Sequence, residues 1–139
     1  MLRLKSLSLV AAALLAGGCI HGMDEVKLTT STEGIPAAQG NVRTMGAPND
    51  NVRVIVKVKH LAPADRVASG ATTYVVWAQP TGSDKVQNLG ALSVDKKLNG
   101  SLMTVLPYES FKVFITAEPG ANITEPTGDM LMTAMVDGR

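Results

Sequence analysis

The chain has a single cysteine, Cys19, whose thiol could take part in chemistry. A thiol can serve as a nucleophile, a metal ligand or a packed core residue, and its surroundings decide among these roles. Cys19 follows a basic segment with Arg3 and Lys5, an apolar run at 7–16 (LSLVAAALLA) and two glycines. This order is typical of a secretory signal peptide. The run is well short of the roughly 20 residues that a membrane-spanning helix needs.

The residues directly in front of the cysteine favour a covalent role for its sulfur. The segment LLAGGC resembles the bacterial lipoprotein signal, or lipobox, although Ala16 stands where that signal most often has leucine. The resemblance implies that the Cys19 sulfur takes a diacylglycerol, that the chain is cut before Cys19 and that the new amino terminus is acylated. Each buried CH₂ adds about 0.8 kcal/mol, so several acyl chains hold a protein at a membrane where one would exchange. A plain secreted protein is the alternative.

The lipobox resemblance implies a location for the mature chain and contact with a membrane. Removal of residues 1–18 takes Arg3 and Lys5 from 13 basic and 12 acidic residues, so the formal charge changes from +1 to −1. No basic patch remains to suggest nucleic acid. With Cys19 used by the anchor, no disulfide can form within the fold. We expect a cell-envelope protein that contacts the membrane through Cys19, and Ile20 favours the outer membrane, facing the periplasm, in a Gram-negative host.

The remaining nucleophiles and metal ligands do not form a recognisable catalytic set. The two histidines, His21 and His60, lie far apart in the sequence, and without a free cysteine they predict neither a zinc site nor a Cys-His pair. No G-x-S-x-G motif marks a serine nucleophile. We therefore expect no enzymatic activity and no cofactor, with a cryptic serine hydrolase as an alternative. His60 is expected half-buried at a strand end.

Three carboxylates, Glu118, Glu125 and Asp129, fall in the Gly/Pro-rich segment 118–129 (EPGANITEPTGD). Loops carry most of the binding sites on rigid scaffolds, so these residues form the candidate binding loop for an envelope protein partner. The segment lacks the dense aspartate pattern of a dedicated calcium loop, so a rigid turn between the last two strands is favoured over a calcium or ligand loop.

A second metal hypothesis rests on methionine. Met130 and Met132 fall on one face of a predicted strand, where soft thioether ligands suit Cu(I). Methionine also fills irregular cores well, so packing is the favoured role and no metal site is predicted. A periplasmic copper or calcium handler stays as an alternative function.

The elements that position these residues are predicted to be strands. Segment 51–61 (NVRVIVKVKHL) alternates valine with mostly polar residues, and the turn formers at 46–50 predict a hairpin with 39–45. Segment 72–79 is apolar on both faces, which is typical of a strand covered on both sides, and we expect Trp77 to be packed in it. Further strands are predicted at 86–94, at 101–106 after an Asn99-Gly100 hairpin turn, at 110–118 and at 130–136.

Six or seven such strands without an amphipathic helix predict an all-β fold, an immunoglobulin-like antiparallel β-sandwich. The Cys-Trp-Cys hallmark of true immunoglobulin domains is absent, so the prediction is one of architecture. The expected organisation is a signal peptide at 1–18, a flexible tether of polar and small residues at 19–36, and the sandwich at 37–139.

Four landmarks follow one another in the second half of the chain: Tyr74-Val75-Val76-Trp77, Asn88-Leu89-Gly90-Ala91-Leu92, Ile115-Thr116-Ala117-Glu118-Pro119 and Pro126-Thr127-Gly128. Their order resembles the extracytoplasmic carboxyl-terminal domain of the anti-sigma-K factor family. The resemblance implies a shared β-sandwich. Because that family carries its sigma-binding helical domain and a membrane-spanning helix before this region, and this sequence has neither, no anti-sigma activity is implied.

The functional expectation is therefore a non-enzymatic, lipid-anchored envelope protein that acts as a structural or binding module. An accessory or sensor domain related to anti-sigma factors, without the part that binds sigma, is a further alternative.

Overall fold

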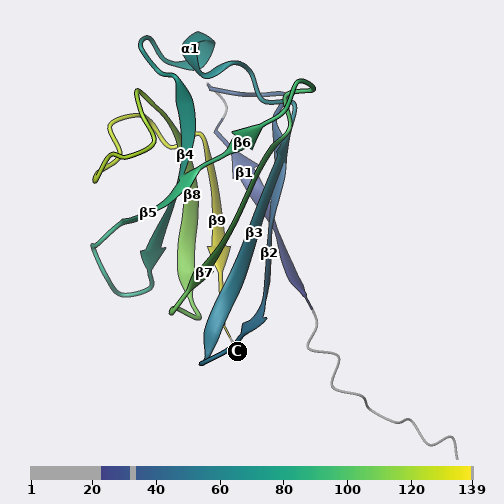
Figure 1. Cartoon of the computed structure of the whole chain (residues 1–139), viewed down its shortest axis with the longest axis vertical. Helices are drawn as coiled ribbons and strands as arrows, with labels where there is room; N and C mark the ends of the chain where they lie inside the picture. Colours follow the sequence, from purple (N-terminus) through teal and green to yellow (C-terminus); the bar gives the residue numbers. More distant parts are fainter. Residues whose placement is uncertain (1–22, 32–33, 139) are drawn as a thin grey trace, which may run out of the picture.

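A computed structural model describes residues 23–31 and 34–138 of the chain (Figure 1). The regular secondary structure of this part is almost entirely β, with nine strands and one short helix. In chain order the elements are β1 Asp24–Thr30, β2 Gln39–Ala47, β3 Asn51–Lys59, α1 Ala64–Val67, β4 Thr73–Pro80, β5 Gln87–Ala91, β6 Ser93–Val94, β7 Gly100–Leu106, β8 Phe111–Glu118 and β9 Met132–Val136. No helix within these residues is both long and apolar enough to cross a membrane.

All strand pairs are antiparallel, and the strands follow the order β5-β4-β8-β9-β1-β2-β3-β7-β6. The sheet folds over into two layers because β1 belongs to both: its residues 24–28 pair with β2, and its residues 29–30 pair with β9. The far ends of the order, β5 and β6, are joined by the single residue Leu92. The predicted all-β antiparallel sandwich is confirmed, with more strands than the six or seven expected.

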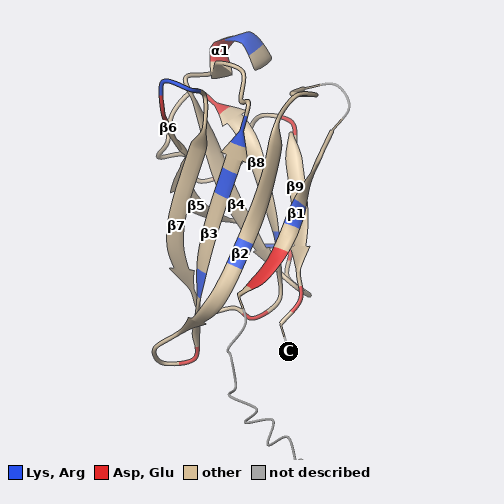
Figure 2. Ribbon diagram, turned by 90° about the vertical axis from the view of Figure 1, so that its right-hand side faces the viewer, with Lys and Arg blue, Asp and Glu red and all other residues tan. Residues whose placement is uncertain are grey.

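The alternation in β3 works as predicted. Val54, Val56 and Val58 are buried in the core between the layers, whereas Lys57 and Lys59 are exposed on the outer face. Figure 2 shows these cations as blue bands along β3. Each buried branched side chain contributes about 1.5–3 kcal/mol, so the burial of these three valines stabilises the fold.

The predicted hairpin between 39–45 and 51–61 is confirmed as β2 and β3, which pair from Gln39 opposite Lys59 to Ala47 opposite Asn51. Its turn holds Asn49 and Asp50 at φ of 61° and 57°. Asn and Asp tolerate this left-handed region better than other non-glycine residues because their short polar side chains bond locally.

The predicted tether at 19–36 is wrong from Asp24 onward, because residues 24–30 form β1 and the sandwich therefore starts before Ala37. Leu28 and Ile35 are 3% and 2% exposed and belong to the core. The stretch has few apolar residues, so its sequence shows no period. Its pairing with β2 and β9 is what places those few residues inside.

Two turns differ from the sequence predictions. The strand expected at 86–94 breaks at the buried Leu92, where the chain passes from one layer to the other as β5 and β6. The Asn99-Gly100 turn is replaced by a loop over 95–99, in which the Asp95 carboxylate accepts backbone hydrogen bonds from Lys97 and Asn99 at 2.9 and 3.0 Å. Gly100 lies in β7, where an added Cβ would come 2.9 Å from a methyl of Leu61.

Candidate functional site

The predicted lipid attachment site lies outside the described residues, and so does His21. Lipid attachment at Cys19 therefore stays a prediction. His60 is described, and it is exposed at a φ of 58° just after β3, not half-buried beside the valines. The positive φ turns the chain out of the strand at this residue, which removes His60 from the alternation.

A second apolar cluster covers the outer face of β4 and β8, away from the main core. It consists of Val75, Trp77 and Phe114, with Val86 and Ile123 packed against it. The rings of Trp77 and Phe114 stack with centroids 6.3 Å apart and planes inclined by 16°. Trp77 is 0% exposed, so the predictions that it is packed and that its strand is covered on both sides are confirmed.

Glu118 lies at the end of β8 and is 0% exposed. One carboxylate oxygen, Oε1, accepts hydrogen bonds from the Thr116 hydroxyl at 2.6 Å, from the Thr127 backbone N–H at 2.9 Å and from the Gly128 backbone N–H at 3.1 Å. The other oxygen accepts from the Thr127 hydroxyl. The Trp77 indole donates to Thr116 Oγ1 at 2.9 Å and extends the network under the loop.

The pKa of Glu118 follows from this setting. Burial by itself raises the pKa of the carboxyl, but the hydrogen bonds from Thr116, Thr127 and Gly128 outweigh it and leave the pKa below its usual value. Donors aimed at a carboxylate favour its charged form. Glu118 is therefore an ionised anchor that holds the loop after β8 against the sheet.

The three carboxylates of the candidate binding loop are not presented together, because Glu118 points into the protein whereas Glu125 and Asp129 are exposed; binding by this loop stays a prediction. In β8 the residues that alternate with the core positions face the outer side, and Glu118 continues the series of Phe114 and Thr116 beneath the loop. Across the described residues, His, Cys, Asp and Glu form no group of three or more placed to hold a metal ion.

The methionine pair does not assemble either. Met132 is 0% exposed in the main core, whereas Met130 precedes β9 and is 44% exposed. The strand starts later than the predicted 130, so the two thioethers do not share a strand face. Their placement gives no support to the copper hypothesis.

The 119–131 loop is also fixed from the side of β5. The Asn88 side-chain amide donates to the backbone oxygens of Ala121 and Ile123, at 2.8 Å in each case. Its carbonyl oxygen accepts from the backbone N–H of Gly90 at 2.8 Å, and Gly90 has a φ of 122° that an L-residue rarely adopts. Two separate sets of hydrogen bonds therefore hold the loop in one conformation.

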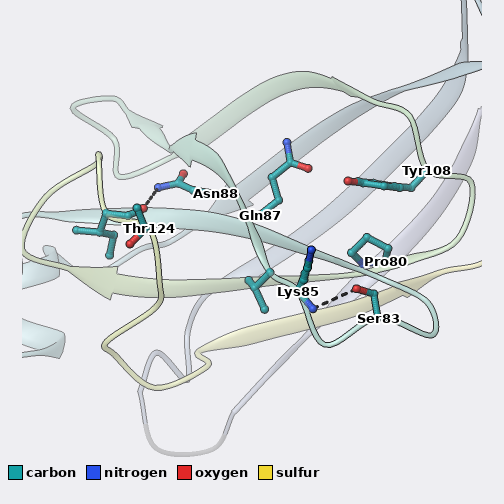
Figure 3. Close-up of a pocket in the computed structure, with 9 residues that line it drawn as sticks. Pro80, Ser83, Lys85, Gln87, Asn88, Tyr108 and Thr124 are labelled. Atoms are coloured by element: carbon teal, nitrogen blue, oxygen red, sulfur yellow. Dashed lines mark hydrogen bonds between the residues drawn. The ribbon is translucent and has the colours of Figure 1, made fainter.

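A groove opens between this loop and the connection from β4 to β5, with a volume of about 620 Å³ (Figure 3). Its wall is mostly apolar with several polar groups at its rim: Pro80, Ser83, Lys85, Val86, Gln87, Asn88, Tyr108, Ile123 and Thr124. Figure 3 shows the Tyr108 hydroxyl pointing toward Gln87, with Asn88 and Thr124 at the other end. We call this site the lateral groove.

Of the three predicted site residues, Glu125 alone lies next to the lateral groove. It lines a smaller depression of about 500 Å³ that shares Lys85, Val86 and Thr124 with the groove. Sequence reasoning missed Ile123 and Tyr108. Ile123 could have been identified from the sequence, because it is the one large aliphatic residue in the otherwise polar or small segment 118–129. Tyr108 could not have been identified in this way, since its position depends on the connection between β7 and β8.

No protein-family model and no curated protein matches the chain. The four landmarks noted in the sequence nevertheless come together in space. Trp77, Asn88, Glu118 and the Thr127-Gly128 pair belong to the two hydrogen-bond sets that fix the 119–131 loop over β4 and β8. In this chain these residues act structurally, because their hydrogen bonds fix the loop.

Proposed function

We propose that this protein is a non-enzymatic binding module of the cell envelope, anchored by lipid at Cys19, that holds a ligand or a partner segment in the lateral groove. The observation that carries this proposal is the groove itself, which has a mostly apolar wall and two bordering segments held by hydrogen bonds. Asn88 and Glu118 hold the 119–131 loop, and the Gln79 side-chain amide holds the connection from β4 to β5 by donating to the Ser83 backbone oxygen at 2.9 Å. A site that is already ordered loses little conformational entropy on binding.

The groove favours a ligand with an apolar body and a polar or anionic edge. Ligand sites typically have volumes of about 300–1,000 Å³, apolar walls and a few convergent polar groups, and the lateral groove has all three features. Val86 and Ile123 supply apolar surface, and the Lys85 ammonium and the Gln87 amide supply donors at the rim. Lys85 and Gln87 are exposed and therefore accessible to a ligand.

The anchor and the fold together determine where this groove operates. The stretch from Cys19 to Asp24, where β1 begins, reaches about 18 Å at most, even fully extended. A chain acylated at Cys19 therefore keeps the sandwich close to the membrane. In a Gram-negative host this membrane is the outer one, with the domain in the periplasm.

The anionic dye 8-anilinonaphthalene-1-sulfonate is a suitable probe of the groove, because it combines an apolar ring system with one sulfonate. We expect it to fluoresce with the wild-type protein and to bind more weakly to Lys85→Glu, which reverses the charge at the rim, and to Gln87→Trp, which fills the mouth. Lys97→Glu is the matched control, since Lys97 is an exposed lysine in the 95–99 loop and does not line the groove. Equal binding by all four proteins would place the dye site elsewhere and remove the support for the groove.

A further inference from the structure

Strand β7 has an edge that is largely without a partner. On one side it pairs with β3 over its whole length, from Gly100 opposite Val58 to Leu106 opposite Val52. On its other side, within the part of the chain that the structure describes, it pairs only with β6, at Gly100 and Ser101. Figure 1 shows β7 continuing well beyond the short β6. The backbone N–H and C=O groups of 102–106 on that edge are available to another strand.

The side chains of this edge are apolar and neutral. Met103 and Val105 point to the outer face and are 67% and 48% exposed. The stretch 98–108 contains no charged residue, and β7 is tan along its length in Figure 2, without blue or red. Natural edge strands are usually guarded by lysine, proline or a bulge because a bare edge recruits other strands. Here no such guard occurs between Gly100 and Leu106.

We propose that a second copy of this chain pairs with this edge, with the two β7 strands antiparallel about a two-fold axis at Thr104. In this register Met103 lies opposite Val105 of the second copy, and Leu102 lies opposite Leu106 of the second copy. Every cross-strand pair is neutral, so no like charges face each other, and the Thr104 pair at the axis is of a kind that contributes to sheet stability. Pro107, which has no backbone N–H, ends the pairing at the same position in both copies.

The charges on the neighbouring strand are compatible with this pairing. Arg53 lies opposite Val105 in the β3–β7 ladder, and Lys57 lies opposite Ser101. In the proposed dimer the two Arg53 side chains are separated by three strand spacings, or about 14 Å. This distance exceeds the Debye length of about 8 Å at physiological ionic strength, so their repulsion is largely screened. The dimer therefore joins two neutral edges and keeps the cations of β3 apart.

A disulfide at the two-fold axis provides the test. Thr104 faces its own counterpart, and opposite residues of an antiparallel pair have Cβ atoms about 4.5–5.5 Å apart, close to the separation that a disulfide requires. We expect full-length Thr104→Cys, oxidised in isolated membranes with copper phenanthroline, to give a band of twice the chain mass on non-reducing gels. Lys57→Cys, which is exposed on the opposite face of the sheet and lies one strand further in, and the wild type are the controls and should stay monomeric.

Charge on the edge should abolish the cross-link. Met103→Lys in the Thr104→Cys background leaves an exposed position exposed but puts two ammonium groups into the pairing strands, so we expect at least a tenfold weaker dimer band. If Thr104→Cys lowers the amount of folded protein, Met103→Cys with Val105→Cys in one chain tests the same register. No dimer band, an equal band from Lys57→Cys, or a band at another mass that contains a different protein would each overturn the proposal.

Discussion

The hydroxyl of Thr116 lies 2.6 Å from Oε1 of Glu118 and joins the carboxylate to the Trp77 indole, so that one buried chain of hydrogen bonds connects β4, β8 and the loop above them. Such a network is worth most when every member is satisfied, because an unpaired polar group in a buried site keeps its full desolvation cost. The stability of the loop, and with it the shape of the lateral groove, therefore depends on Glu118.

Glu118→Ala should lower the free energy of unfolding by at least about 3 kcal/mol, because it leaves the donors of Thr116, Thr127 and Gly128 without an acceptor, at roughly 1–3 kcal/mol for each unsatisfied group. Urea unfolding followed by Trp77 fluorescence measures this loss. Glu125→Ala, which removes an exposed carboxylate from the same loop, should stay within about 0.5 kcal/mol of the wild type. Equal effects of the two substitutions would contradict the structural role of Glu118.

The depressed pKa of Glu118 makes the stability depend on pH in a defined direction. The contribution of Glu118 is fully present above its unfolded-state pKa of about 4.3 and is lost as the pH falls through the lower folded-state pKa. Glu118→Gln, which cannot ionise, should be less stable than the wild type at pH 7, and the difference should shrink below about pH 4. Unfolding curves between pH 2 and 7 test this, and a constant difference across that range would count against an ionised Glu118.

Gly128 should tolerate no side chain, because an added Cβ would lie 2.6 Å from the backbone oxygen of Ala117. Gly128→Ala must push the loop away from β8 and should cost about 1–3 kcal/mol. Gly120→Ala is the matched control in the same loop, since no heavy atom beyond its own chain neighbours lies within 4 Å of its Cβ position. Thermal unfolding of both variants distinguishes the two sites, and a similar melting temperature for both would show that the loop does not pack as described.

Tyr74 should titrate at unusually high pH. Burial, and secondarily the Asp65 carboxylate, raises its pKa to about 12, and its hydroxyl donates to the backbone oxygen of Ala62. The stability that Tyr74 supplies is complete below the unfolded-state pKa of about 10 and is lost as the pH rises toward 12. Absorbance at 295 nm should show a high-pH tyrosine transition that is missing in Tyr74→Phe. If Tyr74→Phe keeps the high-pH transition, that transition does not belong to Tyr74 and the raised pKa is contradicted.

The strands with regular alternation could be predicted from the sequence because the pattern lies within the strand itself and does not depend on distant residues. β3 repeats valine at every second position, and the β2–β3 turn has the residues that a hairpin needs. β1 could not be predicted in this way, since its place depends on pairing with β2 and with the distant β9. The break at Leu92 was missed for the same reason: it marks a change of layer, which leaves no periodic signal.

The candidate site could be predicted only in part. The segment 118–129 was identified as a constrained loop, and all of it except Glu118, the last residue of β8, lies in the loop between β8 and β9. The lateral groove, however, combines residues near 80–88 with Tyr108 and Ile123. These positions are far apart in the sequence, and only the antiparallel pairing of β4 with β5 and β8 brings them together.

Metabolic labelling with an alkyne analogue of palmitate tests the lipid anchor, on which the proposed function as an envelope protein depends. The account predicts that the full-length protein takes up the label, and that Cys19→Ala abolishes labelling and leaves an uncleaved precursor of higher mass. Val94→Ala, an exposed substitution in the folded part, should be labelled like the wild type. A wild-type protein that is expressed in its own host and stays unlabelled would contradict the account.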